Sequence, residues 1–570
     1  MKKISLLYSI ALMGATALVG CTDFLDKEPM DRFTNNANFW NNEASVEGYA
    51  NTFYNQFAGF SDFYFPELTD DQVARGFANW KFVNVPESNS NWSATYTEIR
   101  RSNEMIAGLE AATKLDDATK NHWLGVARLM RAYQYWDLVR KYGDCVWVDF
   151  VPDVDDEILY AARTDRDEVM DHVLDDLNFA VANIQESSDK RYWSRAMAQA
   201  MKSHICLWEG TYSKYRKTDA GQKAPDEEHA KKFLQESVNA SEAIMNSGDF
   251  SLGNYADLYR SVSLQNNPEV IFCKEYKKDV MSHETIMYTC MSTMINGMSK
   301  DAFDSYLFID GKTVKDTQYQ GDQYNRGVME VSKNDSKEHL NINNMLAVRD
   351  KRLAVQLDTV LCVQGNPWPR LANGTAMTSS TGYGVAKFDN VTLEKTYRES
   401  GKNYTSAPLY WLAEIYLNYA EAKAELGTIT NEDLDKSVNL LKDRAGLPHI
   451  TTAVVSPDKD AVLDAGVSDL IFEIRRERRC ELMFDNDFRY WDLIRWHQLD
   501  KLDTTKNPDI MLGADVTGNK AGTTVKTIDG KEFIDGSNGF TRTYDAKNYF
   551  YPIPSGQITL NPKLTQNPGW

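Results

Sequence analysis

Apolar side chains recur at helical spacing along several long segments of the chain. The clearest segment spans residues 122–142, where Trp123 and Met130 belong to one apolar stripe and Trp136 belongs to a second. A helix that is apolar on two sides packs between neighbours rather than on a surface. Gly143 follows directly, as a glycine does at a helix C-cap. The pattern therefore predicts a long, centrally packed helix that ends at this glycine.

Comparable segments come in pairs along the chain. The pairs are 43–57 with 94–109, 122–142 with a helix capped by Thr164, a helix opened by Ser194 with 227–247, and 409–426 with a helix capped by Asn431. Helical pairs of this length resemble tetratricopeptide repeats, although the Trp/Leu/Gly/Tyr signature is not cleanly kept. The pattern predicts a mostly α-helical fold built from four helical hairpins.

The helical pattern breaks between about residues 250 and 407 and again between 500 and 550. Short strand-like pieces at 269–273, 353–363 and 384–388 alternate there with loops rich in Asn, Gly and Ser. Long loops in a compact domain usually carry function or wrap a surface. We therefore predict a single domain at 39–570, in which a helical core (39–250 and 408–500) carries a loop-rich, partly β insertion packed on it.

The amino terminus has the features of a targeting segment. Lys2 and Lys3 precede an uncharged, mostly apolar run at 4–19, which is short for a membrane-spanning helix. Leu-Val-Gly-Cys ends this run at Cys21 and resembles a bacterial lipoprotein box. We predict a signal peptide at 1–20, an acylated Cys21 and a polar, acidic tether at 21–38. An uncleaved anchor helix is the alternative.

Composition and charge narrow the class of protein. Hydrophobic residues make up 42% and charged residues 25%, as in globular proteins. Lys and Arg number 63 against 82 Asp and Glu, giving a net charge of −19 that disfavours nucleic acid as a partner. The six cysteines after Cys21 form no CxxC pair, which favours free, buried thiols.

Enzyme and metal signatures are absent from the sequence. No GxSxG, GxGxxG, Walker or HExxH pattern occurs, and the eight histidines are isolated. A pair of carboxylates, as in glycosidases, remains open in so acidic a chain. The acidic loops leave room for calcium, but no DxDxDG loop is present and we predict no metal or cofactor.

The segment 475–496 combines charges of both signs with Trp491 and Trp496. Arg475, Arg478 and Arg479 lie at helical spacing from several acidic residues of the same segment. Such a mixture predicts a partly buried network of ion pairs and aromatic rings, and a catalytic carboxylate pair is the less favoured alternative.

Several blocks, in this order, are similar to the RagB/SusD family of Bacteroidetes outer-membrane lipoproteins. They are CTDFLDKEP (from Cys21), FWNNEASVEGYANTFYNQF (Phe39), LMRAYQYWDLVRKYGD (Leu129), NNPEVIF (Asn266), LAEIYLNYAEAKAELG (Leu412), LLKDRAGLP (Leu440), RRERRCELMFDNDFRYWDLIRW (Arg475) and YFYPIPSGQITLNPKLTQNPGW (Tyr549). The resemblance covers nearly the whole chain and is weakest in the central insertion.

The resemblance implies a binding protein and not an enzyme. Members of this family have four tetratricopeptide-like hairpins with a variable loop-rich part. They are anchored by lipid on the outer face of the outer membrane, where they capture oligosaccharides or, in some cases, peptides. They hand these ligands to a SusC-like TonB-dependent transporter barrel. A peptide-binding or glycopeptide-binding protein of the same fold and a scaffold with protein partners only are the alternatives.

Candidate ligand contacts are aromatic and polar residues in two loop segments. A sugar offers an apolar C–H face and a rim of hydroxyls, so its site needs flat rings with polar groups at their edges. The candidates are Tyr64, Asp71, Arg75, Phe77, Trp80 and Asn91 in the first segment, and Tyr288, Trp368 and Tyr383 in the insertion. Packing in the core is the competing role for these rings, and Trp368, between two prolines, must be exposed to contact a ligand.

Overall fold

A computed structural model describes most of the chain. The described residues are 36–60, 68–74, 79–290, 296–363, 365–372, 374, 376–485, 488–519 and 523–570. Predicted Cys21 acylation and the segments 1–20 and 21–35 lie outside them. Within the described part, no helix is both long enough and apolar enough to cross a membrane.

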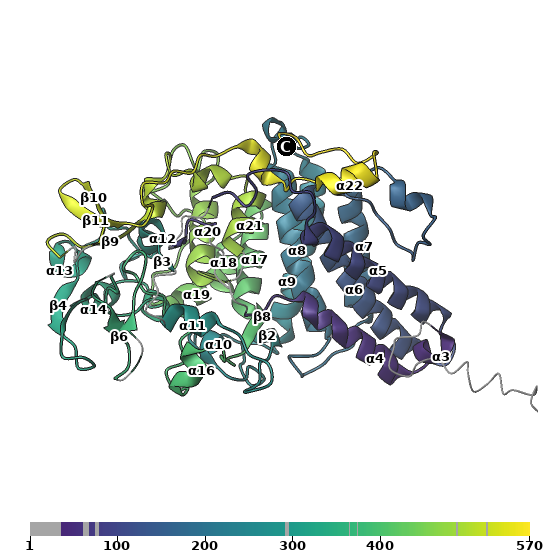
Figure 1. Ribbon diagram of the computed structural model, residues 1–570, viewed down its shortest axis with the longest axis horizontal. Helices are drawn as coiled ribbons and strands as arrows, with labels where there is room; N and C mark the ends of the chain where they lie inside the picture. Colours follow the sequence, from purple (N-terminus) through teal and green to yellow (C-terminus); the bar gives the residue numbers. More distant parts are fainter. Residues whose placement is uncertain are drawn as a thin grey trace, which may run out of the picture.

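Antiparallel helices form one half of the molecule (Figure 1). They are α3 (Ala37–Trp40), α4 (Glu43–Asn51), α5 (Ser90–Ala111), α6 (Asp117–Tyr142), α7 (Arg166–Asn183), α8 (Arg195–Tyr215) and α9 (Glu227–Ser247), with the 3₁₀ helix η1 (Thr52–Gln56) after α4. The pairs α5–α6, α6–α7 and α8–α9 pack on one another. Trp123, Tyr135 and Trp193 are fully buried in the core between them.

A second helical group lies at the centre of the molecule (Figure 1). It contains α17 (Leu412–Glu425), α18 (Asn431–Asp435), α19 (Val438–Ala445), α20 (Asp469–Glu481) and α21 (Phe488–Arg495). Helix α17 packs against α8, α9 and α20, and α21 packs against α8. Helix α8 therefore joins the two helical groups.

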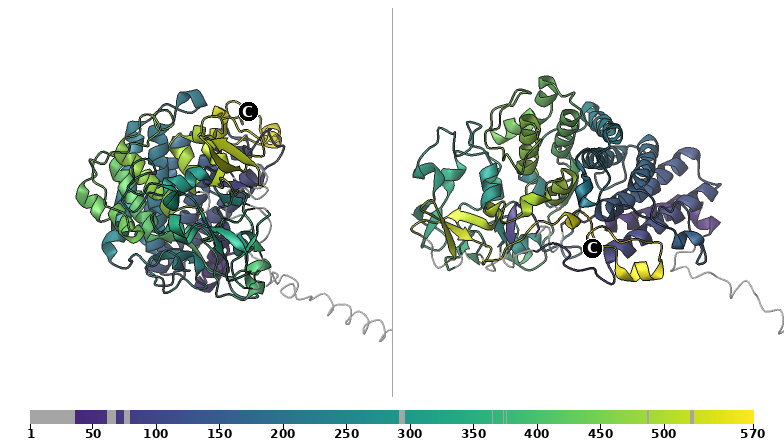
Figure 2. Two further views of the ribbon diagram at one scale, coloured as in Figure 1. Left: turned by 90° about the vertical axis from the view of Figure 1, so that its left-hand side faces the viewer. Right: turned by 90° about the horizontal axis from the view of Figure 1, so that it is seen from above.

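Small sheets and short helices make up the remaining half, which Figures 1 and 2 show on the side away from α5–α7, except for α22, which lies beside these helices. The antiparallel pairs are β1 (Gln72–Ala74) with β3 (Asn296–Met298), β2 (Val270–Lys274) with β8 (Ala407–Trp411), β4 (Val328–Val331) with β5 (Glu338–Asn341), and β6 (Trp368–Pro369) with β7 (Ala376–Met377). Strands β9 (Leu512–Asp515), β10 (Val525–Ile528) and β11 (Lys531–Asp535) form a sheet in the order β10-β11-β9. The short helices are α10 (Asp257–Arg260), α11 (Thr285–Cys290), α12 (Lys300–Ser305), α13 (Asp322–Asn325), α14 (Asn343–Leu346), α15 (Leu353–Gln356), α16 (Lys395–Glu399) and α22 (Ser555–Leu560).

The expected fold class, mostly helical with a partly β insertion, is confirmed. Helix α9 has the predicted bounds, and Ser194 caps α8 by accepting a hydrogen bond from the backbone N–H of Met197. Some boundaries are different from those expected. Asp165 caps α7 in place of Thr164, and Thr430 caps α18 in place of Asn431.

Three segments take a different structure from the predicted one. Residues 407–411 form β8 because they pair with β2, so α17 starts only at Leu412. The segment 353–363 begins with the short helix α15 and continues in single bridges rather than as a strand. The segment 384–388 is likewise no strand and forms a single bridge, from Val385 to Leu357. In each case pairing with another segment contributes to the structure, and the local sequence does not report it.

The charged segment 475–496 forms a buried network, as predicted, but its partners lie mainly on other elements. Arg479 pairs with Asp71, at 2.8 Å between Nε and Oδ1, and Arg475 pairs with Glu425. Arg478 binds Asp492, at 2.8 Å, from the next helix. The helical spacings within the segment therefore did not identify these ion pairs.

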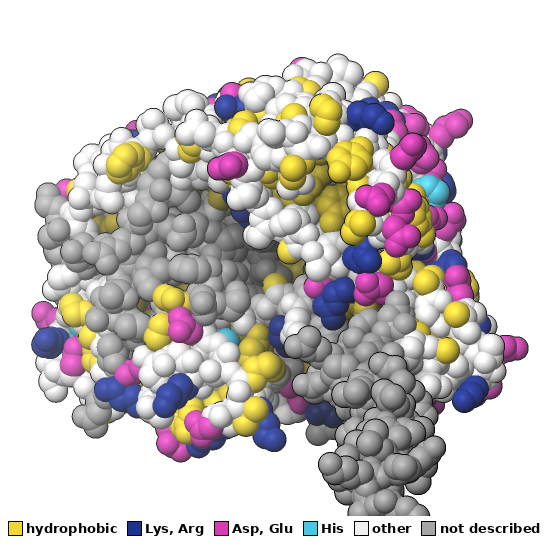
Figure 3. Space-filling model, turned by 45° about the vertical axis from the view of Figure 1, so that its right-hand side comes forward, with side chains coloured by type: hydrophobic (Ala, Val, Ile, Leu, Met, Phe, Trp, Pro, Cys, Tyr) yellow, Lys and Arg dark blue, Asp and Glu magenta, His cyan; other side chains and the backbone are white. Residues whose placement is uncertain are grey.

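The described cysteine side chains at 145, 206, 273, 362 and 480 are free and buried. On the surface in Figure 3, carboxylates gather along one margin next to exposed hydrophobic side chains, in keeping with the net charge of −19.

Candidate functional site

The predicted ligand contacts do not form one site in the described part of the chain. Tyr64, Arg75 and Phe77 lie outside the described residues. Asp71, only 3% exposed, binds Arg479 in the buried network. Of the candidates that the structure describes, it brings Asn91 alone into a sizeable cavity.

The aromatic candidates have structural partners of their own. Trp368 is buried in the β6–β7 hairpin against His339, so its ring is not exposed as a sugar contact requires. Tyr383 is buried and stacks on Phe303, with ring centroids 4.4 Å apart. The prolines beside Trp368 and the glycines beside Tyr383 did not predict that these rings would be buried.

Two further candidates are partly exposed. The Trp80 indole N–H donates to the backbone carbonyl of Thr543, at 2.7 Å, and the Tyr288 hydroxyl donates to Glu284. Neither residue lines the cavity that contains Asn91. Each side chain is therefore hydrogen-bonded to a residue outside this cavity.

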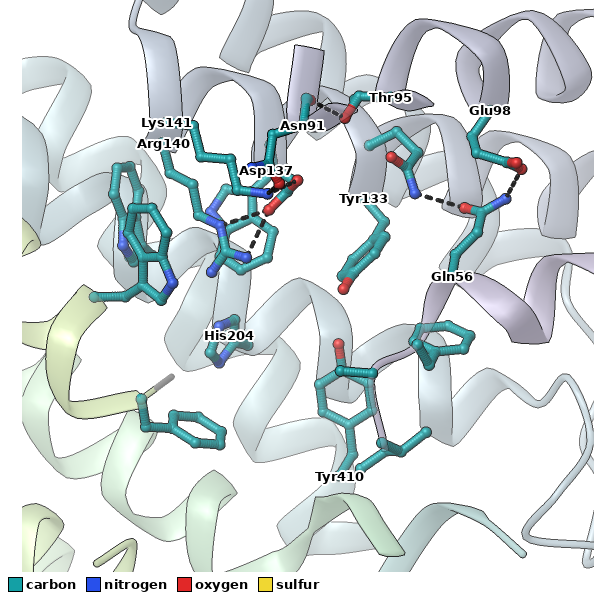
Figure 4. Close-up of a pocket in the computed structure, with 18 of the residues that line it drawn as sticks. Gln56, Asn91, Thr95, Glu98, Tyr133, Asp137, Arg140, Lys141, His204 and Tyr410 are labelled. Atoms are coloured by element: carbon teal, nitrogen blue, oxygen red, sulfur yellow. Dashed lines mark hydrogen bonds and ion pairs between the residues drawn. The ribbon is translucent and has the colours of Figure 1, made fainter. Parts of the chain in front are cut away.

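A cavity of about 550 Å³ lies where the two helical groups meet (Figure 4). We call it the aromatic cavity. It is lined by side chains of η1 and the residues just after it, and of α5, α6, α8, β8, α20 and α21. The aromatic lining residues are Phe57, Tyr133, Trp136, Trp208, Tyr410, Phe488 and Trp491. This volume falls within the range of about 300–1,000 Å³ that is typical of small-molecule sites.

Amide and hydroxyl groups from η1, α5 and α6 form one wall of the aromatic cavity. The side-chain amide of Gln134 donates to Gln56, at 2.7 Å, and Gln56 donates to Glu98, at 2.6 Å (Figure 4). The N-cap Asn89 accepts the backbone N–H of Asn91 and so fixes the start of α5. This wall is polar and internally ordered.

The carboxylate of Asp137 organises two cations at the end of α6. Arg140 and Lys141 both donate to it, at 2.6 Å, and Lys141 also donates to the side-chain oxygen Oδ1 of Asn91, at 3.2 Å. Burial alone would raise the pKa of Asp137, but the charges of Lys141 and Arg140 outweigh burial and lower the pKa to about 2. Asp137 is therefore ionised at neutral pH.

The guanidinium of Arg140 lies between two indole rings. Its central carbon is 4.2 Å from the ring centroid of Trp136 on α6 and 4.2 Å from that of Trp491 on α21. Such cation–π contacts are strongest where water is excluded, and both rings are nearly buried. Arg140 thus joins the two helical groups at one end of the aromatic cavity.

The hydroxyls of Tyr133 and Tyr410 point toward one another across the cavity (Figure 4). Tyr410 is 7% exposed, and its hydroxyl has no hydrogen-bond partner among the residues that the structure describes. Burial, with the nearby Tyr133 and Glu414, raises the pKa of Tyr410 well above its ordinary value. The phenol therefore remains a neutral O–H donor that faces the cavity.

Sequence reasoning missed all of these residues except Asn91. A signal was present in α6: Tyr133, Asp137 and Arg140 are spaced by four and three residues, which places polar groups on one face of an otherwise apolar helix. Tyr410 and Trp491 come from distant segments and carry no such signal.

A second hollow of about 290 Å³ lies beside α20. We call it the charged crevice. Its charged lining residues are Asp70, Asp301, Asp304, Asp458, Asp460, Asp464, Arg475, Arg476, Arg479, Arg489, Lys501 and Lys506.

Asp167, Glu209 and His229 have the spacing of a possible metal site. Arg166 binds Glu209, however, and Arg216 binds Asp167, so the carboxylates are already paired with cations. A metal ion would have to displace these guanidinium groups, and the donor set does not fit one.

Comparisons with known proteins identify the family. Residues 268–570 match the model described as "SusD family", and residues 22–207 match the model described as "Starch-binding associating with outer membrane". A SusD-like protein of Bacteroides ovatus is 23% identical over 98% of this chain and 97% of its own length. SusD-like protein P2 of Formosa agariphila is 24% identical over 84% of this chain and 80% of its own length.

Solved structures share the fold. A SusD-like carbohydrate-binding protein of Bacteroides fragilis superposes with a TM-score of 0.68 at 19% identity, covering 92% of this chain and all of that one. A laminarin-binding SusD-like protein superposes with a TM-score of 0.52 at 16% identity, covering 93% of this chain and 99% of that one. The family model covers more than half of the chain, and the chain belongs to the SusD family.

Proposed function

We propose that this protein is a cell-surface lipoprotein that captures oligosaccharides in the aromatic cavity and delivers them to a TonB-dependent transporter. The observation that carries the proposal is the division of the cavity into a polar wall and an aromatic wall, with the Tyr410 hydroxyl facing the space between them.

The two walls match the two surfaces of a sugar ring. Moving the C–H face of a sugar from water onto an aromatic surface is favourable, by about 25 cal/mol per Å² of apolar surface buried. The hydroxyls of the sugar need hydrogen-bond donors and acceptors. Asn91, Tyr410 and the polar wall that contains Gln56 supply these groups. The ligand class is also that of two structural relatives, one carbohydrate-binding and one laminarin-binding.

The anchoring and the transporter partner rest on the sequence. The lipobox-like Cys21 supplies an attachment point for lipid, and the family model describes outer-membrane association. We expect Cys21→Ser to release the protein from the membrane fraction. If this variant stays in that fraction, an acylated Cys21 is not the anchor.

Binding of a soluble form that starts at Thr22 to a broad glycan panel, followed by calorimetry, tests the capture step. We expect a dissociation constant of roughly micromolar to millimolar, because captured ligand must be released. Asn91→Ala should weaken binding severalfold, whereas Asn246→Ala, on the exposed face of α9, should not. Equal binding by both variants would exclude the aromatic cavity, and no binding to any glycan would overturn the proposal.

A further inference from the structure

A histidine stands in the wall of the aromatic cavity. His204 projects from α8, and its ring lies edge-to-face with Trp136, at 5.2 Å between centroids, and with Phe488, at 5.5 Å (Figure 4). Its side chain keeps 17% exposure. The imidazole is therefore a polar group set among the aromatic rings of the cavity.

A buried carboxylate fixes the orientation and tautomer of this ring. The Nδ1 atom of His204 lies 2.7 Å from Oε1 of Glu414, a fully buried residue of α17. A carboxylate can only accept, so Nδ1 carries the proton and donates. In the uncharged ring, Nε2 then has a free lone pair and acts as an acceptor.

Glu414 is itself held in place by a chain of hydrogen bonds. Arg478 donates to the side-chain oxygen of Asn418, at 2.9 Å, and the amide of Asn418 donates to Oε1 of Glu414, at 3.4 Å. Partners that fix a ring in this way set its function as much as the ring itself does, as is known for histidines that bind metals.

The Nε2 atom is the unused end of this arrangement. It has no hydrogen-bond partner among the described residues and is not among their buried unpaired atoms, so it remains accessible from the cavity. A buried carboxylate is costly to keep in a protein interior. The buried position of Glu414 is explained if this carboxylate orients His204 so that Nε2 can accept a hydrogen bond from a ligand.

We infer that His204 accepts a hydrogen bond from a hydroxyl of an uncharged sugar, and that Glu414 is the positioning residue that keeps Nε2 available. This inference rests on the proposed function and names the ligand class of the same site. A sugar carboxylate at this position would face a lone pair with the negative charge of Glu414 behind it. Neutral oligosaccharides are therefore the expected ligands, and uronate-bearing ones are disfavoured.

Calorimetry with matched probes tests the inference. The neutral probes are maltohexaose, laminarihexaose and xylohexaose, and hexagalacturonate is the charged one. We expect the protein to bind at least one neutral probe more tightly than the uronate. His204→Phe keeps a flat ring but no acceptor and should weaken that binding about tenfold, as expected for one hydrogen bond to a desolvated group.

Three further variants separate recognition from folding. His204→Gln keeps an acceptor and should retain part of the affinity, and His449→Gln, at an exposed site away from the cavity, should retain all of it. Glu414→Ala should weaken binding as His204→Phe does, whereas Glu414→Gln keeps an acceptor for Nδ1–H and should rescue it. The ¹⁵N shifts of the His204 ring should report the proton on Nδ1 in the unchanged protein without any ligand.

The outcomes distinguish this inference from the proposed function. Neutral-probe binding that His204→Phe leaves unchanged would overturn the role of His204 and leave glycan capture intact. A preference for hexagalacturonate, or a ring proton on Nε2, would also overturn it. Failure of the unchanged protein to bind any glycan would overturn both.

Discussion

The aromatic cavity and the charged crevice both contain polar side chains, but they differ in what these side chains already bind. In the charged crevice, Arg489 makes two hydrogen bonds to Asp70, and Arg479 pairs with Asp71 and Asp301. At the aromatic cavity, the Tyr410 hydroxyl and Nε2 of His204 have no partner among the described residues.

This difference shows why density of charge is a poor guide to a binding site. Oppositely charged groups that satisfy one another hold segments of the chain together and leave little capacity for a ligand. A few oriented groups without protein partners, placed among flat rings, leave that capacity available. The comparison predicts that changes in the charged crevice affect stability and that changes in the aromatic cavity affect binding.

The largest effect is expected in the charged crevice. Asp70→Ala should lower the free energy of unfolding by about 3–5 kcal/mol, because Arg489 would lose its buried partner. Urea denaturation measures this loss, and the folded fraction should bind glycans unchanged. Asp304→Ala is the matched control, because Asp304 is 38% exposed and its pair with Lys300 should contribute no more than about 1 kcal/mol. Equal effects of the two changes would contradict this account.

A smaller, pH-dependent effect on the free energy of unfolding is expected at Asp137, which also lines the aromatic cavity. The folded pKa of about 2 lies below the ordinary value of 3.8, so the ionised carboxyl contributes about 2 kcal/mol to stability. That contribution is complete above the unfolded pKa and is lost as the pH falls toward 2. Asp137→Asn should remove this part of the acid-induced loss, as urea denaturation between pH 2 and 6 would measure. If Asp137→Asn lost as much stability at low pH as the unchanged protein does, other carboxyls would cause the acid-induced loss.

Local sequence predicted the features that depend on neighbours along the chain. The apolar stripes of α6 predicted its central packing, Gly143 predicted its end, and Ser194 predicted the start of α8. The order of family blocks gave the fold class. Each of these signals lies within one helix or at its ends.

The candidate site was predicted poorly because its contacts join distant segments. His204 and Glu414 are 210 residues apart, and Asp70 and Arg489 are 419 residues apart. Aromatic loop residues such as Trp368 looked suitable by composition, yet core packing uses the same residue types. Whether a ring faces a ligand or the interior is decided by tertiary contacts, which a single sequence does not report.

The most specific test of the comparison uses two buried tyrosines whose hydroxyls differ in hydrogen bonding. The hydroxyl of Tyr419 donates to Asp433, at 2.6 Å, whereas that of Tyr410 has no partner among the described residues. Tyr419→Phe should therefore lower the free energy of unfolding by about 1 kcal/mol and leave glycan affinity unchanged. Tyr410→Phe should do the reverse, with a loss of about 1 kcal/mol in binding and little change in stability.

Denaturation and calorimetry on the same two variants measure both quantities. Each change removes a single oxygen atom from a buried ring, so volume and packing stay matched between them. If Tyr410→Phe instead destabilised the fold and left binding intact, its hydroxyl would serve the structure, and the contrast between the two hollows would fail at its central residue. If both variants kept full affinity but only Tyr419→Phe lost stability, ligand would bind elsewhere, while the distinction between paired and unpaired hydroxyls would still hold.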